Sequence, residues 1–583
     1  YSGNTGGTDS SNYGPFLDYE FFYQGWSALV RDGARVINNS FGTNTRIVPN
    51  GQVNGADGFD ISDMLPVNTT QETEYEYFLF NKVYGPGKSF VDAAYQAVKD
   101  AEAVQVMTTG NRDMKEPYYR ALYPYFNPEA ERHWIAAAGL QKVKGDGAHA
   151  KYGLIKQFDE AGNAKWWAIA GTGAHIYSAS VVDGDYFIPG QTDDEGNFVK
   201  PGTPLGTPYY SYLTGTSMAA PHITGAMGVI LSRYLDMSAV DARTVLFSTA
   251  NHCNPDGSLM DGWDPRLKEG QVSDRLGWGT PDLKKAMHGP AQLLGTLVYR
   301  QNERDFDIWT NDITQTAWDQ RRIEDLQWMA ITKNGKDLVN AGVIDEAGSE
   351  PEKVGGAYLL GNHVTVVGIE DDSIDVEKAN AWRAAYYEKR ARAIGERLAK
   401  NDWGCDGYDG ALVKDGKGTL ILTGHNVYRG GTLVKDGTLL GFADSFGVTA
   451  SAEASHGNGR VLVQGGAFGI LNTVNDTVTL TGNKVSGTFD HSVDITLDGG
   501  TLLIALGETV DLKNGTVTIK DGEIGVDLSS PVLTKALKAG QSVTGRLVAS
   551  EIKGKIRPMK MADESLKLTV SQEGNVITVT VSK

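Results

Sequence analysis

Apolar residues in the first half of the chain alternate between helical and extended spacing. Within residues 17–37, apolar side chains recur three to four positions apart, as in an amphipathic helix, and this helical pattern ends at Gly33. A short apolar run at 34–42 predicts a buried strand, and the polar, Gly- and Asn-rich stretch 43–88 is typical of an inserted surface loop. Further helices are predicted at 89–101, 217–234 and 238–250, and strands at 103–110, 133–140 and 166–180. This order indicates an α/β fold with a parallel sheet covered by helices, which residues 275–295 close.

Two local signals refine these helices. Ser89 stands where an N-cap belongs, just before the apolar pattern of the helix at 89–101. The helix at 217–234 is rich in small residues, which would permit a close approach to a neighbouring sheet. We expect that packing to run through Ala219, Ala220, Gly225, Ala226 and Gly228.

The pattern changes twice in the second half of the chain. Residues 296–407 are charged and mixed, with a helical pattern at 376–400, and are predicted to form a connector module. From 408 to 583 many short segments alternate with period two between Gly, Asn and Asp turns. Irregular repeats of about 20 residues predict a β-solenoid, written here as a right-handed parallel β-helix stem, with a β-sandwich as the alternative. The expected domains are 1–295, 296–407 and 408–583.

Composition narrows the function. The 583 residues exceed one compact core, and the formal net charge of -18 argues against nucleic acid as a partner. Cys253 and Cys405 are the only cysteines, and spacing leaves open whether they pair. No apolar run is long enough to predict a membrane span. The chain starts at Tyr1 with neither a basic nor an apolar leader region, so we expect a processed or trimmed product.

One serine is a candidate nucleophile. Ser217 opens the predicted helix 217–234, where its own N–H lacks an intrahelical acceptor and is available to an oxyanion. Gly215 and Thr216 allow a tight turn from strand to helix, and Pro221 falls in the predicted first turn, where a missing N–H costs little. Serine is also a common N-cap, so these residues alone leave both roles open.

The surrounding strings resemble the subtilisin-like serine proteases. "GTSMAAPHITGAMG" at 215–228 is similar to their nucleophile motif, and "VINNSFG", "TTGN" and "AGTGAHIYSA" resemble further family segments in the right order. The resemblance covers about residues 15–295.

The resemblance implies a role for each matching residue. Ser217 would be the nucleophile of a serine endopeptidase, and Asn111 would donate its amide to the oxyanion beside the Ser217 N–H. Ser40, Phe41 and Gly42 would pair with substrate as an added strand, while Thr108, Thr109 and Gly110 would form the other wall. Removing the side-chain oxyanion donor of a subtilisin costs about 3 to 4 kcal/mol.

The sequence departs from the family in one respect. The family's orienting aspartate and base histidine lie in "DTG"-like and "HGTH"-like motifs before these segments, and neither string occurs in this chain. His222 shares a helix with Ser217 but matches a non-catalytic family histidine. The missing part could be cleaved and still bound, absent from this chain, or lost from an inactive remnant. We favour an incomplete or processed chain, because Asn111 and the nucleophile turn are intact.

The C-terminal part resembles autotransporters. "GALVKDGKGTLILTGHNVYRGGTLVKDGTL" at 410–439 is similar to their passenger-associated repeat. The resemblance implies a protease passenger, secreted or held at the surface of a Gram-negative bacterium, which acts on protein or peptide substrates. Its other partners would be an outer-membrane translocator barrel, absent here, and its own cleaved N-terminal fragment. A surface adhesin or structural passenger with a vestigial protease is the alternative.

Metal binding is left open by the sequence. The acidic loops 254–265 and 192–197 carry glycine and oxygen ligands of the kind that Ca²⁺ prefers, and subtilisin-like proteases often bind it. Neither loop has a defined ligand spacing, and solvated turns are the favoured interpretation of both. No cofactor or metal ligand is therefore assigned.

Overall fold

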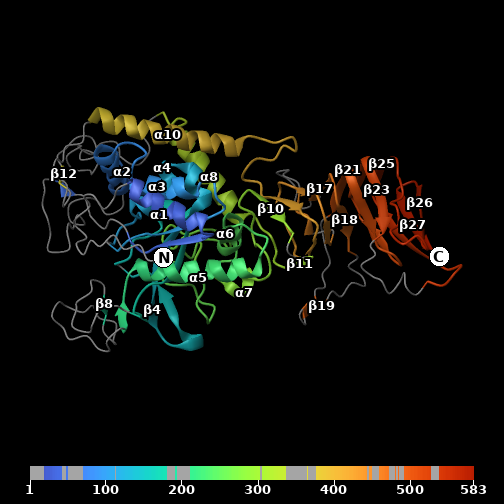
Figure 1. Cartoon of the computed structure of the whole chain (residues 1–583), viewed down its shortest axis with the longest axis horizontal. Helices are drawn as coiled ribbons and strands as arrows, with labels where there is room; N and C mark the ends of the chain where they lie inside the picture. The colour runs from blue at the N-terminus through green and yellow to red at the C-terminus, as the bar shows by residue number, and fades with distance from the viewer. Residues whose placement is uncertain are drawn as a thin grey trace. The chain divides into compact units, whose positions relative to one another are not determined.

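A computed structural model describes most of the chain. The described residues are 19–41, 48–49, 70–111, 113–155, 157–179, 191–192, 210–302, 305–336, 364–365, 376–442, 445–448, 459–471, 479–480, 483–484, 492–526 and 537–583. The chain forms two compact units (Figure 1). Unit 1 comprises residues 1–231, 238–283 and 320–396, and unit 2 comprises 232–237, 284–319 and 397–583. The stretch expected as one connector, 296–407, is thus shared between the units, and the three domain boundaries stay a prediction.

A parallel sheet forms the centre of unit 1. Its strands are β1 (Val36–Asn39), β3 (Val104–Thr108), β4 (Trp134–Lys144) and β6 (Ala168–Thr172), hydrogen-bonded in that order and all parallel. β5 (Lys151–Gly153) pairs antiparallel with the far end of β4. Every residue of β3 is buried, as in a strand covered on both faces, and the one amide among them, Gln105, donates to Ala94 O at 3.0 Å.

Helices flank this sheet, as predicted. α1 (Tyr19–Arg31) and α3 (Phe90–Val98) lie together on one side, and α5 (Thr216–Arg233) lies on the other (Figure 1). Unit 1 also contains α4 (Tyr119–Phe126) and α6 (Ala239–Ser248). The N-cap prediction at Ser89 is confirmed, because its side chain accepts from Asp92 N within a capping box.

The packing expected for α5 is half right. Ala219, Ala220 and Ala226 are buried, and a Cβ added at Gly171 of β6 would lie 3.0 Å from Ala219 O, so the helix does approach the sheet closely. Gly225 and Gly228 are exposed with open space around them, and the expectation that they pack inward is wrong. They lie on the outward face of the helix, where a missing side chain brings no closer contact.

The prediction of a surface loop at 43–88 is wrong for the second half of that stretch. Residues Thr70–Tyr84 form helix α2, and Glu74 of this helix is completely buried. Its carboxylate accepts from Arg383 Nε (2.6 Å) and from Tyr386 Oη (2.8 Å), both on α10 (Val376–Leu398). The polar residues that resembled a loop are therefore held inside by a partner about 300 positions later. Residues 48–49 (β2) also pair with 364–365 (β12).

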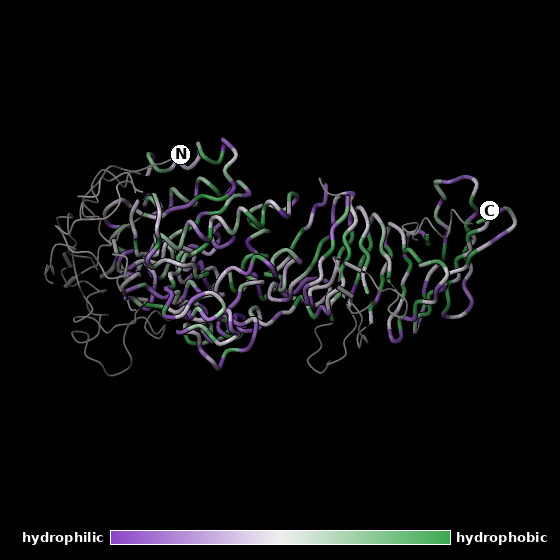
Figure 2. Tube along the Cα trace, turned by 90° about the horizontal axis from the view of Figure 1, so that it is seen from below, coloured by the Kyte–Doolittle hydropathy of each residue, from purple (hydrophilic) through white to green (hydrophobic). Residues whose placement is uncertain are grey.

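Unit 2 consists largely of two columns of parallel strands. The first column is β10 (Thr296–Arg300), β13 (Ala411–Asp415), β15 (Thr432–Val434) and β17 (Gly459–Val463), and the second is β11 (Phe306–Trp309), β14 (Thr419–Leu422), β16 (Thr438–Gly441) and β18 (Ala467–Ile470). The long strands β21 (Val493–Ile504) and β23 (Thr516–Val526) continue both columns, and β25 (Glu551–Gly554) extends the first. Figure 2 shows these strands side by side.

The chain ends in a different arrangement. β24 (Ser542–Val548), β27 (Val576–Ser582) and β26 (Lys567–Glu573) form an antiparallel sheet, to which β22 (Thr509–Asp511) adds one parallel strand. The prediction of a parallel β-helix over the whole of residues 408–583 is therefore wrong at its C-terminal end. Short turns such as the one after Glu573 allow antiparallel hairpins, which parallel rungs cannot use.

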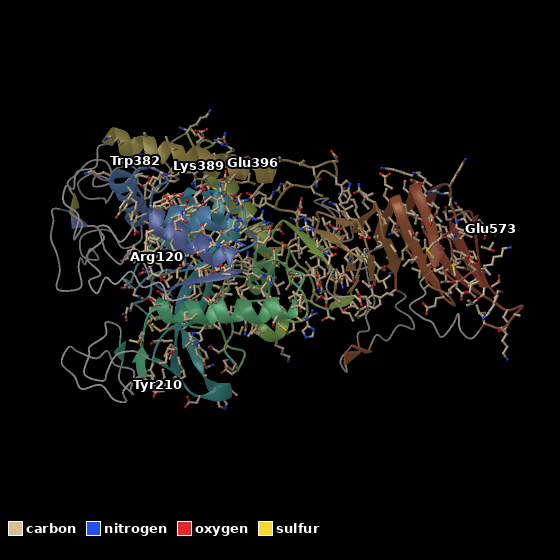
Figure 3. The ribbon with its side chains drawn as sticks, viewed as in Figure 1. Arg120, Tyr210, Trp382, Lys389, Glu396 and Glu573 are labelled. Carbon is tan, nitrogen blue, oxygen red and sulfur yellow. The ribbon has the colours of Figure 1, made fainter. Side chains whose placement is uncertain are left out.

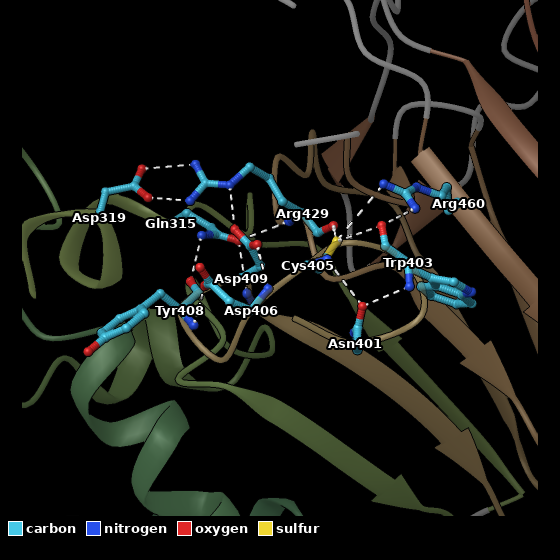
Figure 4. Close-up of polar contacts among 11 residues, drawn as sticks. Gln315, Asp319, Asn401, Trp403, Cys405, Asp406, Tyr408, Asp409, Arg429 and Arg460 are labelled. Atoms are coloured by element: carbon cyan, nitrogen blue, oxygen red, sulfur yellow. Dashed lines mark hydrogen bonds and ion pairs between the residues drawn. The ribbon is translucent and has the colours of Figure 1, made fainter. Parts of the chain in front are cut away.

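A polar cluster in unit 2 joins the segment that precedes β13 to the segment that precedes β15 (Figure 4). Arg429 donates through Nε to Asp409 (2.8 Å) and also pairs with Asp319, while its backbone N–H donates to Gln315 Oε1 (2.9 Å). Cys405 Sγ contacts Arg429 O at 3.1 Å, and burial raises the pKa of the Cys405 thiol. Cys253 and Cys405 are both free thiols.

Candidate active site

Ser217 lies at the start of α5, as the sequence predicts. The helix begins one residue earlier, at Thr216, so Pro221 is its sixth residue rather than part of the first turn. A proline has no N–H, and in a regular helix the N–H of residue 221 would bond to the carbonyl of residue 217. That carbonyl instead accepts from Ser40 Oγ at 2.7 Å. The bond from Ser40 thus replaces the missing helical bond and joins Ser217 to the segment that follows β1.

Asn111 is brought to the same helix start. Its Oδ1 accepts from Thr216 N at 2.8 Å and from Thr216 Oγ1 at 3.2 Å, and Gly110 N donates to that hydroxyl at 3.2 Å. Two donors on Oδ1 fix the orientation of the amide, since the alternative flip would place its NH₂ against the N–H of Thr216. The Nδ2 donors of Asn111 consequently face away from Thr216.

In the segment Ser40–Phe41, a hydrogen bond to its hydroxyl positions Ser40 and aromatic packing positions Phe41. Asn38 Nδ2 donates to Ser40 Oγ at 2.9 Å, and the Phe41 ring stacks on Phe22 and Trp26 at centroid distances of 5.8 and 6.4 Å. β1 is the end strand of the sheet among the described residues, so its outer edge is suited to adding a strand. Gly42 lies outside the described residues.

The residues expected to form the other wall are held rigidly. Thr108 and Thr109 are buried, and Thr108 Oγ1 accepts from Arg120 Nε at 3.1 Å. Gly110 has φ +128°, and an added Cβ would lie 2.0 Å from Asp159 Oδ2. Only glycine fits this position without a shift. Asp159 and Tyr118, which crowd Gly110, were missed, because no local pattern in the sequence marks them as its neighbours.

The described histidines near α5 do not resemble a base for Ser217. His222 is exposed, and its Nδ1 lies 2.8 Å from Met218 O on the same helix. His175 has φ +55° and stacks on Tyr212 with centroids 4.2 Å apart. The identity of the base and of its orienting acid stays a prediction.

The acidic loop at 254–265 makes ion pairs. Asp256 pairs with Lys151, and Asp264 pairs with Arg266 at 2.7 Å. The hydrogen bond from Arg266 lowers the pKa of Asp264 to about 2. Among the described residues no group of three or more His, Cys, Asp or Glu could hold a metal ion. The second candidate loop, 192–197, lies outside the described residues beyond Thr192.

The length and apolar character of the helices bear on membrane insertion. Across the described ranges, no helix combines the length and the apolar character that crossing a membrane requires.

Comparison with known proteins finds two family matches along the chain. Residues 13–279 match the subtilase family (peptidase S8), and residues 412–440 match the passenger-associated-transport-repeat. An extracellular serine protease of Serratia marcescens is 24% identical over 427 residues, which is 71% of this chain and 33% of that protein. The Neisserial autotransporter lipoprotein NalP of Neisseria meningitidis is 24% identical over 510 residues, which is 84% of this chain and 39% of that protein.

A further relative covers less of the chain. The adhesin BmaC autotransporter of Brucella suis is 37% identical over 114 residues, which is 19% of this chain and 2% of that protein. The chain thus corresponds to well under half the length of each of these three relatives.

Proposed function

We propose that this chain, a subtilase-family autotransporter passenger that is secreted or held at the surface of a Gram-negative bacterium, is a serine endopeptidase. One observation carries the proposal. Asn111 Oδ1 accepts from Thr216 N at 2.8 Å, which turns the Asn111 amide donors outward at the start of the helix that bears Ser217. A nucleophile beside a fixed side-chain donor and a free helix N–H is the arrangement that acyl transfer requires.

The reaction would proceed through an ester on Ser217. Its Oγ bonds to the carbonyl carbon of the scissile peptide while its proton passes to the base. The charge that develops on the carbonyl oxygen is stabilised by Asn111 Nδ2 and the Ser217 N–H. The C–N bond then breaks, the proton goes to the leaving amine, and water releases the acid from the ester. Ser40, Phe41 and Gly42 would hold the substrate backbone as an added strand, opposite the wall of Thr108, Thr109 and Gly110.

The base and its orienting acid would come from an upstream segment. The family resemblance puts both before residue 36, in motifs that this sequence does not contain. We therefore infer that the active enzyme holds an N-terminal fragment in addition to these 583 residues. The outer-membrane translocator would be the partner at the other end.

Unit 2 would serve as the stem of the passenger. Its two columns of parallel strands and the repeat at 412–440 support a right-handed parallel β-helix. Each rung contacts only its neighbours, so such a stem can fold progressively after export.

Labelling with a fluorophosphonate tests the activity. The purified protein and a Ser217→Ala variant would be treated with the probe and measured by intact mass. We expect one adduct on the wild-type protein, none on the variant, and a second mass for the retained fragment. An unlabelled wild-type protein that contains an N-terminal fragment would contradict the proposal.

A second function is favoured by one comparison. The likeness to the adhesin BmaC autotransporter supports a surface-displayed binding or structural passenger with a vestigial protease. The coding sequence before Tyr1 separates the two functions. Intact "DTG"-like and "HGTH"-like motifs there would support the endopeptidase, and disrupted ones would support the adhesin.

A further inference from the structure

Four aromatic rings form a continuous stack on a small sheet of unit 1. β7 (Ile176–Ala179) pairs antiparallel with β9 (Tyr210–Leu213), which brings Tyr177 opposite Tyr212. The rings follow one another as His175–Tyr212 (4.2 Å between centroids), Tyr212–Tyr177 (4.7 Å) and Tyr177–Tyr210 (5.3 Å). We call these four residues the aromatic ladder.

The aromatic ladder faces solvent. Tyr177 and Tyr210 are each 50% exposed although both are stacked. Figure 3 places Tyr210 at the outer edge of unit 1, far from Arg120 and Trp382. The strands β7, β8 (Gln191–Thr192) and β9 contain no charged residue, in a chain whose net charge is -18. A contiguous, exposed aromatic surface on strands without charged residues is typical of a binding site.

The aromatic ladder is joined to the nucleophile turn by the backbone. β9 ends at Leu213, four positions before Ser217. His175 N donates to Thr214 Oγ1 at 2.8 Å, and Gly215 N donates to Gly173 O at 2.8 Å. The start of β7 and the end of β9 are therefore both fixed to the turn that presents the proposed nucleophile, which makes the aromatic ladder continuous with the segment that bears Ser217.

We propose that the aromatic ladder docks an extended, uncharged segment of the polypeptide substrate that carries proline or aromatic side chains, an inference that rests on the proposed endopeptidase function. Exposed aromatic rings offer a large apolar area to flat side chains, and the tyrosine hydroxyls supply polar contacts to a peptide backbone. Proline-rich segments dock on aromatic surfaces because their extended conformation is already formed before binding. The absence of charge on the three strands favours an uncharged segment over an acidic or basic one.

Binding to the inactive Ser217→Ala full chain tests the inference without turnover. The probe is an uncharged, fluorescently labelled ten-residue peptide rich in proline and tyrosine. The reference peptide has alanine and serine at those positions. We expect the ring-bearing peptide to bind at least about tenfold more tightly, and Tyr177→Ala with Tyr210→Ala to remove about that factor. Tyr177→Phe, which keeps the ring, should retain most of the binding, and Val143→Ala, at an exposed site outside the aromatic ladder, should change nothing.

Three results would overturn the inference. These are equal binding of the two peptides, unchanged binding by the double variant, and ladder-dependent binding of a neutral oligosaccharide in place of the peptide. The wild-type protein separates this failure from that of the proposed function. Loss of peptide binding with intact fluorophosphonate labelling contradicts only the aromatic ladder, whereas ladder-dependent binding by an unlabelled protein that contains the N-terminal fragment contradicts only the endopeptidase.

Discussion

The two compact units bury their strands in different ways. In unit 1 all five residues of β3 are buried, and the strand ends at a cluster of specific contacts among Gly110, Asn111 and Thr216. In unit 2 the residues of β14 alternate between half-buried and buried, and each strand pairs in register with the next rung. Unit 1 thus depends on a few contacts between residues far apart in sequence, while unit 2 depends on a local pattern repeated many times. A substitution in unit 1 should therefore act by removing one contact partner. A substitution in unit 2 should act by disturbing the regular pairing of successive strands.

The largest effect is expected at the buried ion pair of unit 1. Glu74→Ala would leave Arg383, which is 1% exposed, as a buried charge without its carboxylate. Breaking a buried pair in this way costs about 3 to 5 kcal/mol. We expect hydrogen exchange in α2 and α10 to accelerate while the strands of unit 2 keep their protection. Glu388→Ala, at an exposed pair with Arg392, is the matched control and should leave exchange unchanged. Equal protection in the two variants would show that the pair is not what holds these helices.

The next effect concerns catalysis. Asn111→Ala should lower kcat by about 10²- to 10³-fold with little change in KM, since the lost donor acts on charge that develops only in the transition state. Thr216→Val keeps the Thr216 N–H bond to Asn111 but removes the hydroxyl that contacts both Asn111 and Gly110, so about a tenfold loss is expected. The kcat and KM of both variants are measured by steady-state hydrolysis of a peptide, with an enzyme preparation that the fluorophosphonate labels. An Asn111→Ala enzyme with unchanged kcat would remove Asn111 from the oxyanion site.

The sequence predicted the parts of each unit that local patterns encode. The parallel sheet, its flanking helices and the N-cap Ser89 follow from apolar spacing, and the positions of Ser217, Asn111 and Ser40 follow from a family motif. Helix α2 was missed because Glu74 looks like a solvated residue until Arg383 is placed beside it. The role of Pro221 was misjudged because the residue lies beyond the first turn, where its missing N–H leaves the Ser217 carbonyl to a donor from a distant segment, Ser40. Contacts between distant segments carry no local signal.

A pH effect distinguishes unit 2. Lys414 is fully buried, and its Nζ donates to the carbonyls of Gly416 (2.6 Å) and Asp436 (3.3 Å) in successive turns. Burial lowers the pKa of Lys414 from 10.5 to about 8. Between pH 8 and 10.5 the unfolded chain therefore binds more protons than the folded one, so stability rises with pH across that window, by up to about 3 kcal/mol.

The measurement for Lys414 is denaturant unfolding of unit 2, followed at several pH values from 7.5 to 11 by β-sheet circular dichroism. A Lys414→Met variant has no proton to lose at this site and should not show the rise. Other titrating groups contribute equally to both proteins, so the difference between the two curves isolates Lys414. Parallel curves would mean that the buried amine keeps its ordinary pKa.

The smallest effect tests whether backbone spacing also matters in unit 1. Gly25 lies within α1, has no positive φ, and has nothing within 4 Å of an added Cβ. Gly25→Ala should therefore stabilise the protein by about 0.5 to 1 kcal/mol, because alanine loses less conformational freedom in a helix. Gly33, just beyond the same helix, has equal space but φ +94°, so Gly33→Ala should destabilise by about 1 kcal/mol. Thermal unfolding of the two variants compares them directly. If both changed stability in the same direction, space around the glycine rather than its backbone conformation would govern α1, and the contrast between local pattern in unit 2 and specific partners in unit 1 would have to be drawn differently.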